Sequence, residues 1–244
     1  MIRTHYFYGC SMTAGDELSD GDLEYPFKMG VTPNYIDVKT RILNTPLKEQ
    51  EYFKANKKAA YPAILGKKCN ILTTNIAENG MSLRQNILKI LSLATNSEEL
   101  IASIFLQIPI LGRELFLTAT SEESIQLANK LYFNNELEAY RIAKLMSHSD
   151  IQSCVEDITD LVLLDGFLKL KNIKFTIIDI NNSLNSRFHL LIPTNYQWMY
   201  HLQRHLPILK VITEEDWCFP SWHMNPYGHE KMADLIKTNI IDKL

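Results

Sequence analysis

Residues 4–15 read Thr-His-Tyr-Phe-Tyr-Gly-Cys-Ser-Met-Thr-Ala-Gly. The first six residues are rich in aromatic side chains and favour a short β-strand, which stops at Gly9. A turn-prone segment of small residues follows and carries Ser11. We therefore expect a strand whose carboxyl end presents the hydroxyl group of Ser11.

Strands and helices alternate along the rest of the chain. We expect strands at residues 69–76, 100–110, 174–180 and 209–212. We expect helices at residues 47–60, at 61–66 with Gly66 as the end, after Ser82 as N-cap, across a long helical stretch at 121–171, and at 230–243. This alternation indicates a mostly parallel sheet covered on both faces. The prediction is a single α/β domain over residues 1–244, with a helical elaboration at 121–171.

Composition and charge narrow the function classes. The chain has 244 residues, of which 46% are hydrophobic and 22% charged, and a net charge of -3. This balance gives no electrostatic support for binding nucleic acid or an anionic membrane. We interpret Lys57, Lys58, Lys67 and Lys68 as a solvated face, with a local basic patch as the alternative. The cysteines form no Cys-x-x-Cys pair, which favours reduced thiols. Without a signal-peptide pattern or an apolar run of about 18 residues, we expect a cytoplasmic protein.

Four segments are expected to meet at one edge of the sheet, because ligands of parallel sheets sit at the carboxyl ends of the strands. They carry Ser11, Gly80, Gln107 and His223. A serine attacks a carbonyl group only when a base takes its proton and donors hold the resulting oxyanion. His223 is the candidate base, and the backbone N–H groups of Ser11 and Gly80 are candidate oxyanion donors.

These segments resemble sequence blocks of the SGNH hydrolases, also called GDSL-type esterases and lipases. Residues 9–15 resemble the first block, GDSxTxG, with Cys10 in place of its aspartate. Residues 75–82, Asn-Ile-Ala-Glu-Asn-Gly-Met-Ser, resemble the second block, NxAxxGxS, and its glycine matches Gly80. Residues 223–229, His-Met-Asn-Pro-Tyr-Gly-His, resemble the last block, DxxHxNxxGH, from its base histidine onward. The blocks occur in the family's order and span nearly the whole chain.

The resemblance implies a three-layer α/β/α sandwich with a mostly parallel, flavodoxin-like sheet, the SGNH hydrolase fold. It also implies that Ser11 is the nucleophile and His223 the base of an acyl-enzyme mechanism, with no cofactor and no metal. The expected substrate is a small acyl ester or the O-acetyl group of an acylated glycan, and no nucleic acid or membrane is expected as a partner.

Two departures from the family pattern affect this interpretation. The third block normally supplies an asparagine to the oxyanion, whereas Gln107 occupies the corresponding strand end and is our candidate substitute. Variant third blocks of this kind resemble those in SGNH-like proteins of phages. The family's acid lies three residues before the base, where this chain has Pro220. The partner of the imidazole is then a backbone carbonyl near Pro220 or the carboxylate of Asp216.

Three other interpretations follow from the same residues. A catalytically impaired binding or structural module of this fold would retain Ser11 and His223 without the usual helpers. A metal site at Cys218, His223 and His229 matches no common zinc spacing. A thiol nucleophile at Cys10 competes with its interpretation as a small buried residue. A dinucleotide site is not supported, because no GxGxxG or P-loop pattern is present in the sequence.

Overall fold

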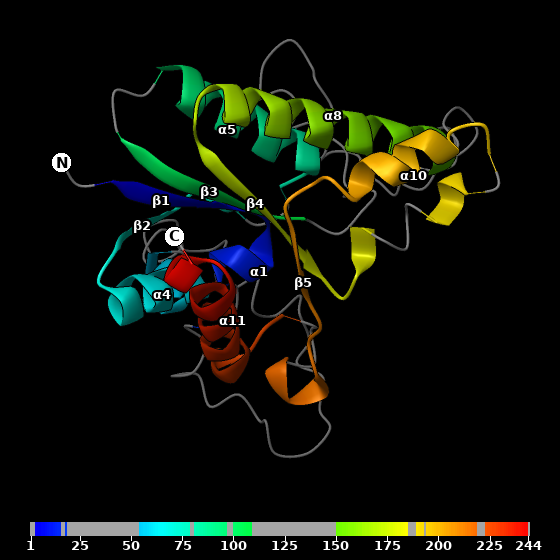
Figure 1. Ribbon diagram of the computed structural model, residues 1–244. Helices are drawn as coiled ribbons and strands as arrows, with labels where there is room; N and C mark the ends of the chain where they lie inside the picture. The colour runs from blue at the N-terminus through cyan, green and yellow to red at the C-terminus, as the bar shows by residue number, and fades with distance from the viewer. Residues whose placement is uncertain are drawn as a thin grey trace, which may run out of the picture.

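A five-stranded parallel sheet forms the centre of the protein (Figure 1). The computed structural model describes residues 3–15, 18, 54–78, 81–96, 100–108, 150–184, 189–192, 194–218 and 223–243. The strands are β1 (Thr4–Tyr8), β2 (Leu72–Asn75), β3 (Ile101–Gln107), β4 (Lys174–Ile180) and β5 (Ile208–Val211). Their order in the sheet is β2-β1-β3-β4-β5. The strand order therefore reverses between β1 and β3, and in open α/β sheets ligands bind outside the carboxyl ends of the strands at such a point.

Helices cover both faces of the sheet. Figure 1 shows α5 (Leu83–Asn96), α8 (Asp150–Leu170) and α10 (Gln197–Gln203) on one face, and α1 (Ser11–Ala14), α4 (Tyr61–Cys69) and α11 (Pro226–Asn239) on the other. Three short 3-10 helices, η2 (His189–Leu191), η3 (Glu215–Trp217) and η4 (Ile241–Lys243), connect or follow these elements. The predicted three-layer α/β/α sandwich with a parallel sheet is confirmed.

The alternation of side chains along β1 explains the two layers. Tyr6 and Tyr8 point into a core shared with α5 and α8, and Phe7 points into a second core shared with α4 and α11. The Phe7 ring stacks on Phe105 of β3 with centroids 4.6 Å apart and an interplanar angle of 6°. Because both faces of this strand bury aromatic rings, the hydrophobic effect fixes its register within the sheet.

Several helix boundaries differ from the sequence-based expectation. Helix α4 does not end at Gly66 but continues to Cys69, and Asn70 ends it in the left-handed conformation with φ 52°. An added Cβ at Gly66 would lie 2.7 Å from the Thr73 hydroxyl oxygen, so this glycine permits close packing of α4 on β2 rather than a turn. The predicted cap of α5 is confirmed, because the Ser82 hydroxyl accepts from the Gln85 N–H at 3.1 Å.

The last helix also begins earlier than expected. It starts at Pro226, because the Asn225 side chain accepts from the Gly228 N–H at 2.9 Å and proline suits the first helical position. It ends at Asn239, and η4 occupies the last residues of the expected helix. Of the helix expected at 47–60, residues 54–59 are helical, and the part of the long stretch at 121–149 lies outside the described residues.

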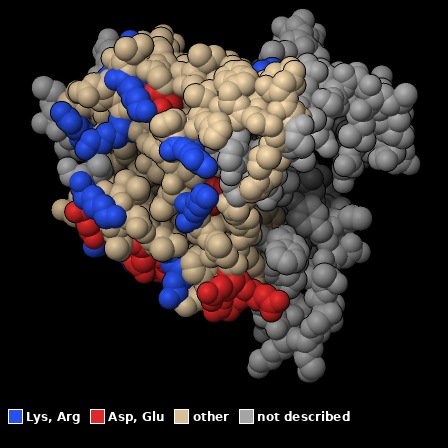
Figure 2. Space-filling model, turned by 45° about the vertical axis from the view of Figure 1, so that its right-hand side comes forward, with Lys and Arg blue, Asp and Glu red and all other residues tan. Residues whose placement is uncertain are grey.

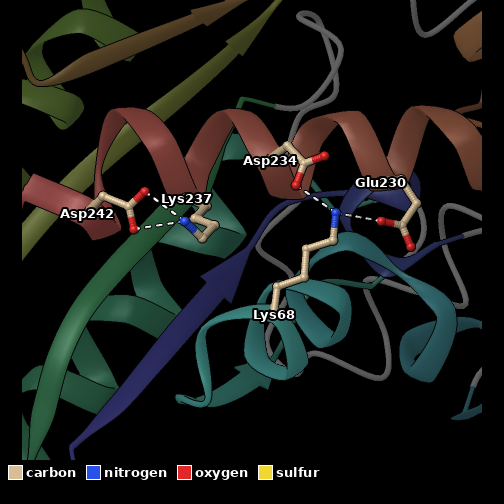
Figure 3. A network of polar contacts seen from close by, with 5 residues as sticks. All are labelled: Lys68, Glu230, Asp234, Lys237 and Asp242. Atoms are coloured by element: carbon tan, nitrogen blue, oxygen red, sulfur yellow. Dashed lines mark hydrogen bonds and ion pairs between the residues drawn. The ribbon is translucent and has the colours of Figure 1, made fainter.

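Ion pairs join α11 to α4 (Figure 3). Lys68 of α4 contacts Glu230 at 2.7 Å and Asp234 at 2.6 Å, and Lys237 contacts Asp242 at 2.8 Å. Lys68 is exposed, as expected, and pairs with two carboxylates of α11. Among the residues that the structure describes, no helix has the length and apolar character needed to cross a bilayer.

Candidate active site

Ser11 is the first residue of α1, directly after the carboxyl end of β1. Two glycines shape the turn that presents it. An added Cβ at Gly9 would lie 2.5 Å from the Thr13 hydroxyl oxygen and 2.8 Å from the Gln107 amide oxygen. Gly15 ends the turn with φ 79°, a left-handed conformation that suits glycine. The first-turn N–H group of Ser11 has no intrahelical acceptor, because the helix begins there.

The imidazole of His223 lies within hydrogen-bonding distance of the Ser11 hydroxyl group. Nε2 of His223 is 2.9 Å from Oγ of Ser11, although the two residues are 212 positions apart in the sequence. Ser11 is buried and His223 is half-buried. A base at this distance can take the hydroxyl proton during attack, which is the geometry required of a nucleophile and its general base.

Two backbone contacts and one side-chain contact hold the His223 segment. Met224 pairs with Cys218 in an antiparallel bridge, and the Asn225 N–H donates to the Trp217 carbonyl at 2.8 Å. The Asn225 side-chain amide donates to the backbone carbonyl of Asp216 at 2.6 Å. These contacts attach the beginning of α11 to η3. The carboxylate of Asp216 is exposed to solvent at this position.

Gln107 contacts the turn at residues 9–15, which we call the Ser11 turn. Its amide oxygen faces the Cys10 N–H at 3.3 Å and the Thr13 hydroxyl at 3.0 Å, and its amide nitrogen donates to the Ile108 carbonyl at 2.5 Å. The oxygen must face the turn, because a backbone N–H can only donate. Gln107 therefore contacts the turn that carries Ser11, and its amide oxygen positions that turn. The amide nitrogen carries a second hydrogen, which the bond to Ile108 does not use.

Two further amides support the same turn. The Asn86 side chain accepts from the Gly9 N–H at 2.9 Å and donates to the Ser82 carbonyl at 2.8 Å. The Asn75 side chain donates to the Thr13 carbonyl at 2.7 Å. We refer to Asn75, Asn86 and Gln107 as the amide clamp. Because the carboxyl ends of β2 and β3 flank β1, two of these amides reach the turn from neighbouring strands.

A buried histidine connects α11 to the base of the turn. Nδ1 of His229 accepts from the Tyr61 N–H at 3.0 Å, and the two rings stack at 5.8 Å. The Tyr61 hydroxyl lies 2.9 Å from the Thr13 hydroxyl, so Tyr61 links His229 to the Ser11 turn. Burial, with a smaller contribution from the nearby charge of His223, lowers the pKa of His229 to about 3. His229 is therefore neutral, with its proton on Nε2.

The metal interpretation fits this geometry poorly. Nε2 of His223 faces Ser11, and Nδ1 of His229 is occupied by the Tyr61 N–H. Within the described ranges, no group of three or more His, Cys, Asp or Glu side chains is arranged to hold a metal ion. Cys10 is buried, and its thiol faces the Gln107 amide oxygen at 3.4 Å.

Sequence reasoning did not single out Asn86, Tyr61 or the ring contact of His229. Asn86 carried a signal that was available, because it shares a helix face with the buried residues Leu83, Ile87 and Ile90. A polar side chain on the apolar face of a helix requires a partner. Gly80, a predicted oxyanion donor, lies outside the described residues.

Comparison with known proteins finds similarity in three dimensions only. No protein-family model and no curated protein sequence matches the chain. A family two carbohydrate esterase from Clostridium thermocellum, in complex with cellohexaose, has a TM-score of 0.51 and 13% identity over 99% of this chain and 64% of that one. The psychrotrophic esterase EstA from Pseudoalteromonas sp. has a TM-score of 0.50 and 9% identity over 98% and 97% of the two chains.

The acetyl xylan esterase Est2A from the rumen bacterium Butyrivibrio proteoclasticus gives a TM-score of 0.50 and 12% identity over 98% of this chain and 64% of that one. This chain therefore spans about two thirds of the length of these two carbohydrate esterases. At such low identities the similarity establishes the fold. The chain has the α/β fold of these esterases, the SGNH hydrolase fold.

Proposed function

We propose that the protein is a serine hydrolase of the SGNH type that cleaves esters through a Ser-His pair. The observation that carries the proposal is the 2.9 Å contact between Oγ of Ser11 and Nε2 of His223, just beyond the carboxyl end of β1. The order of sequence blocks and the shared fold support it. Ester hydrolysis is the chemistry that the named structural neighbours have in common.

In the proposed first step, the Ser11 oxygen attacks the ester carbonyl while Nε2 of His223 takes the hydroxyl proton. The N–H groups of Ser11 and Gly80 stabilise the oxyanion, and the remaining hydrogen of the Gln107 amide nitrogen is the third candidate donor. The tetrahedral intermediate collapses, the C–O bond to the alcohol breaks, and His223 returns its proton to the departing alkoxide. An acyl-enzyme ester on Ser11 remains.

Water then releases the acyl group. His223 takes a proton from the attacking water, the second tetrahedral intermediate collapses, and the proton passes to the Ser11 oxygen. The imidazolium that forms in both steps is stabilised by an acceptor near Nδ1. Asp216 is the candidate carboxylate for this role, because its backbone is already joined to the base segment through Asn225.

The proposed substrates are small acyl esters, and O-acetyl groups on carbohydrate in particular. Support comes from neighbours of the same fold that are described as carbohydrate esterases, one of them an acetyl xylan esterase.

The second candidate function is a binding module of this fold with an impaired site. The exposed position of the Asp216 carboxylate favours it, because an orienting acid normally lies against the imidazole. Such a module would bind the acylated ligand without turnover.

A panel of p-nitrophenyl esters from acetate to octanoate tests the proposal. The wild type is expected to hydrolyse acetate best, and Ser11→Ala and His223→Ala are expected to lose activity. Ser92→Ala, which removes an exposed hydroxyl group on α5, is the matched control and should retain it. Hydrolysis that survives both site substitutions, or that the wild type never shows, would reject the mechanism in favour of the binding module.

A further inference from the structure

A surface groove of about 560 Å³ lies beside the Ser11 turn. Helical residues 54–59 form one wall, with the side chains of Lys54, Lys57 and Lys58. The exposed edge of the sheet forms the other, with Thr73, Thr74 and Asn75 of β2. Pro62 and Ala63 complete the lining, so the groove combines three cationic groups with a largely apolar surface.

Two contacts connect the walls of this groove to the candidate active site. Asn75 is a member of the amide clamp and donates to the Thr13 carbonyl at 2.7 Å. On the other wall, the backbone carbonyl of Asn56 packs against Gly15, where an added Cβ would lie 2.7 Å from that oxygen. A ligand in the groove would thus lie next to the turn that carries Ser11.

The lysines of the groove keep their charge available for a ligand. Lys68 and Lys237 are bound by carboxylates (Figure 3), and Lys89 is bound by Glu78 at 2.9 Å. Among the described residues, no carboxylate lies within ion-pair distance of Lys54, Lys57 or Lys58.

Lys57 is partly withdrawn from water, unlike the solvated residue expected from the sequence. Burial lowers its pKa, and Lys89 adds to that effect while Glu78 opposes it. Among the described residues no carboxylate lies within ion-pair distance of this half-buried ammonium group, so an anion that binds beside it would stabilise its charged form.

We infer that the groove binds an acidic oligosaccharide, with its carboxylates against Lys54, Lys57 and Lys58 and its uncharged ring faces against the apolar lining at Pro62 and Ala63. The inference rests on the proposed function, because it makes an acyl group on a neighbouring sugar the substrate of Ser11. Figure 2 shows basic and acidic side chains intermingled over the described part of one face, and the net charge is -3. The cations thus act locally in a concave site with a largely apolar lining, which suits a short anionic saccharide better than a membrane or a nucleic acid.

Binding of trigalacturonic acid, measured by isothermal titration calorimetry on the full chain carrying Ser11→Ala, tests this inference without turnover. The variant Lys54→Gln/Lys57→Gln/Lys58→Gln removes the cations of the groove. The matched control, Lys67→Gln/Lys174→Gln/Lys243→Gln, makes the same charge change at exposed lysines outside it. The groove variant is expected to bind about tenfold more weakly at low salt, because three partly exposed charge contacts each contribute modestly. The control should bind as the parent does.

Neutral maltotriose and inorganic phosphate serve as comparison ligands. Salt-sensitive binding of the acidic trisaccharide, with weaker binding of maltotriose and of phosphate, supports the inference. Equal affinities for the acidic and neutral trisaccharides, phosphate binding that matches the trisaccharide, equal weakening by both triple variants, or no binding at millimolar concentration would overturn it. Binding is measured in the Ser11→Ala protein, so its result does not depend on ester hydrolysis. Lysine-dependent binding together with an inactive wild type would support the groove proposal and reject the proposed esterase activity.

Discussion

His229 joins α11 to α4 through a hydrogen bond that only its neutral form can make. The residue is fully buried, and its Nδ1 accepts from the Tyr61 N–H at 3.0 Å. The substitution His229→Asn keeps an acceptor at the same bond distance from the backbone, because the amide oxygen of asparagine replaces Nδ1. It also removes the titratable ring. The variant therefore separates the pH dependence of His229 from its hydrogen bond.

The expected size of the effect follows from the two pKa values. Burial lowers the pKa of His229 to about 3 in the folded protein, from an ordinary value of 6.5. Between these values the unfolded chain binds a proton that the native protein does not, so the free energy of unfolding falls as the pH drops. At about pH 5 the loss is about 2 kcal/mol, since each pH unit below the unfolded pKa contributes about 1.4 kcal/mol. The figure holds for any native pKa below about 4.

Urea unfolding at about pH 7.5 and about pH 5 measures this loss. The wild type is expected to lose about 2 kcal/mol more between the two pH values than His229→Asn does. The variant starts from a lower stability, because it no longer stacks on Tyr61, so the comparison uses the change with pH. His5, whose pKa burial also lowers, is present in both proteins and cancels. The control His205→Asn removes an exposed histidine and should keep the wild-type dependence. Equal losses in the wild type and His229→Asn would refute the reasoning.

Three substitutions test the packing of the Ser11 turn, the amide clamp and the ion pairs between α4 and α11. Gly9→Ala is expected to lower stability by about 1–3 kcal/mol and to abolish ester hydrolysis, because its Cβ has no space, whereas Gly166→Ala in α8 has no atom within 4 Å and should stabilise by about 0.5–1 kcal/mol. Urea midpoints that shift alike would show that the turn is not tightly packed. Gln107→Met keeps the side-chain volume but leaves a buried N–H without an acceptor, so about 1–3 kcal/mol should be lost in the same assay, and an unchanged midpoint would contradict the amide clamp. Lys68→Met removes two exposed ion pairs and should change thermal stability by less than about 1 kcal/mol, and a larger loss would indicate a stronger network than the geometry supports.

The sequence predicted the sheet because strand patterns and parallel topology are local and regular. A run of aromatic residues predicted β1, and Ser11 follows directly after its end. Gln107 was correctly placed at the end of β3, whereas the donors and acceptors that its amide meets depend on the turn packed above it. Side-chain hydrogen bonds of this kind are set by tertiary packing and leave little trace in a single sequence.

The errors have the same physical origin. Gly66 was expected to end α4, because glycine favours helix ends, but close packing on Thr73 explains the glycine instead. Lys57 was expected to be solvated, because clustered lysines usually lie on the protein surface. In the structure it is half-buried and lines the groove. The N-cap at Asn225 was missed, although asparagine followed by proline is a recognisable helix start.

Labelling with a fluorophosphonate tests the claim that Ser11 is an activated nucleophile. Intact mass and peptide mapping of the wild type should show one adduct, on Ser11. Labelling should be absent in Ser11→Ala and much slower in His223→Ala, because the base 2.9 Å from the hydroxyl oxygen would be missing. No adduct on the wild type at high probe concentration, or an adduct that persists in Ser11→Ala, would contradict the account.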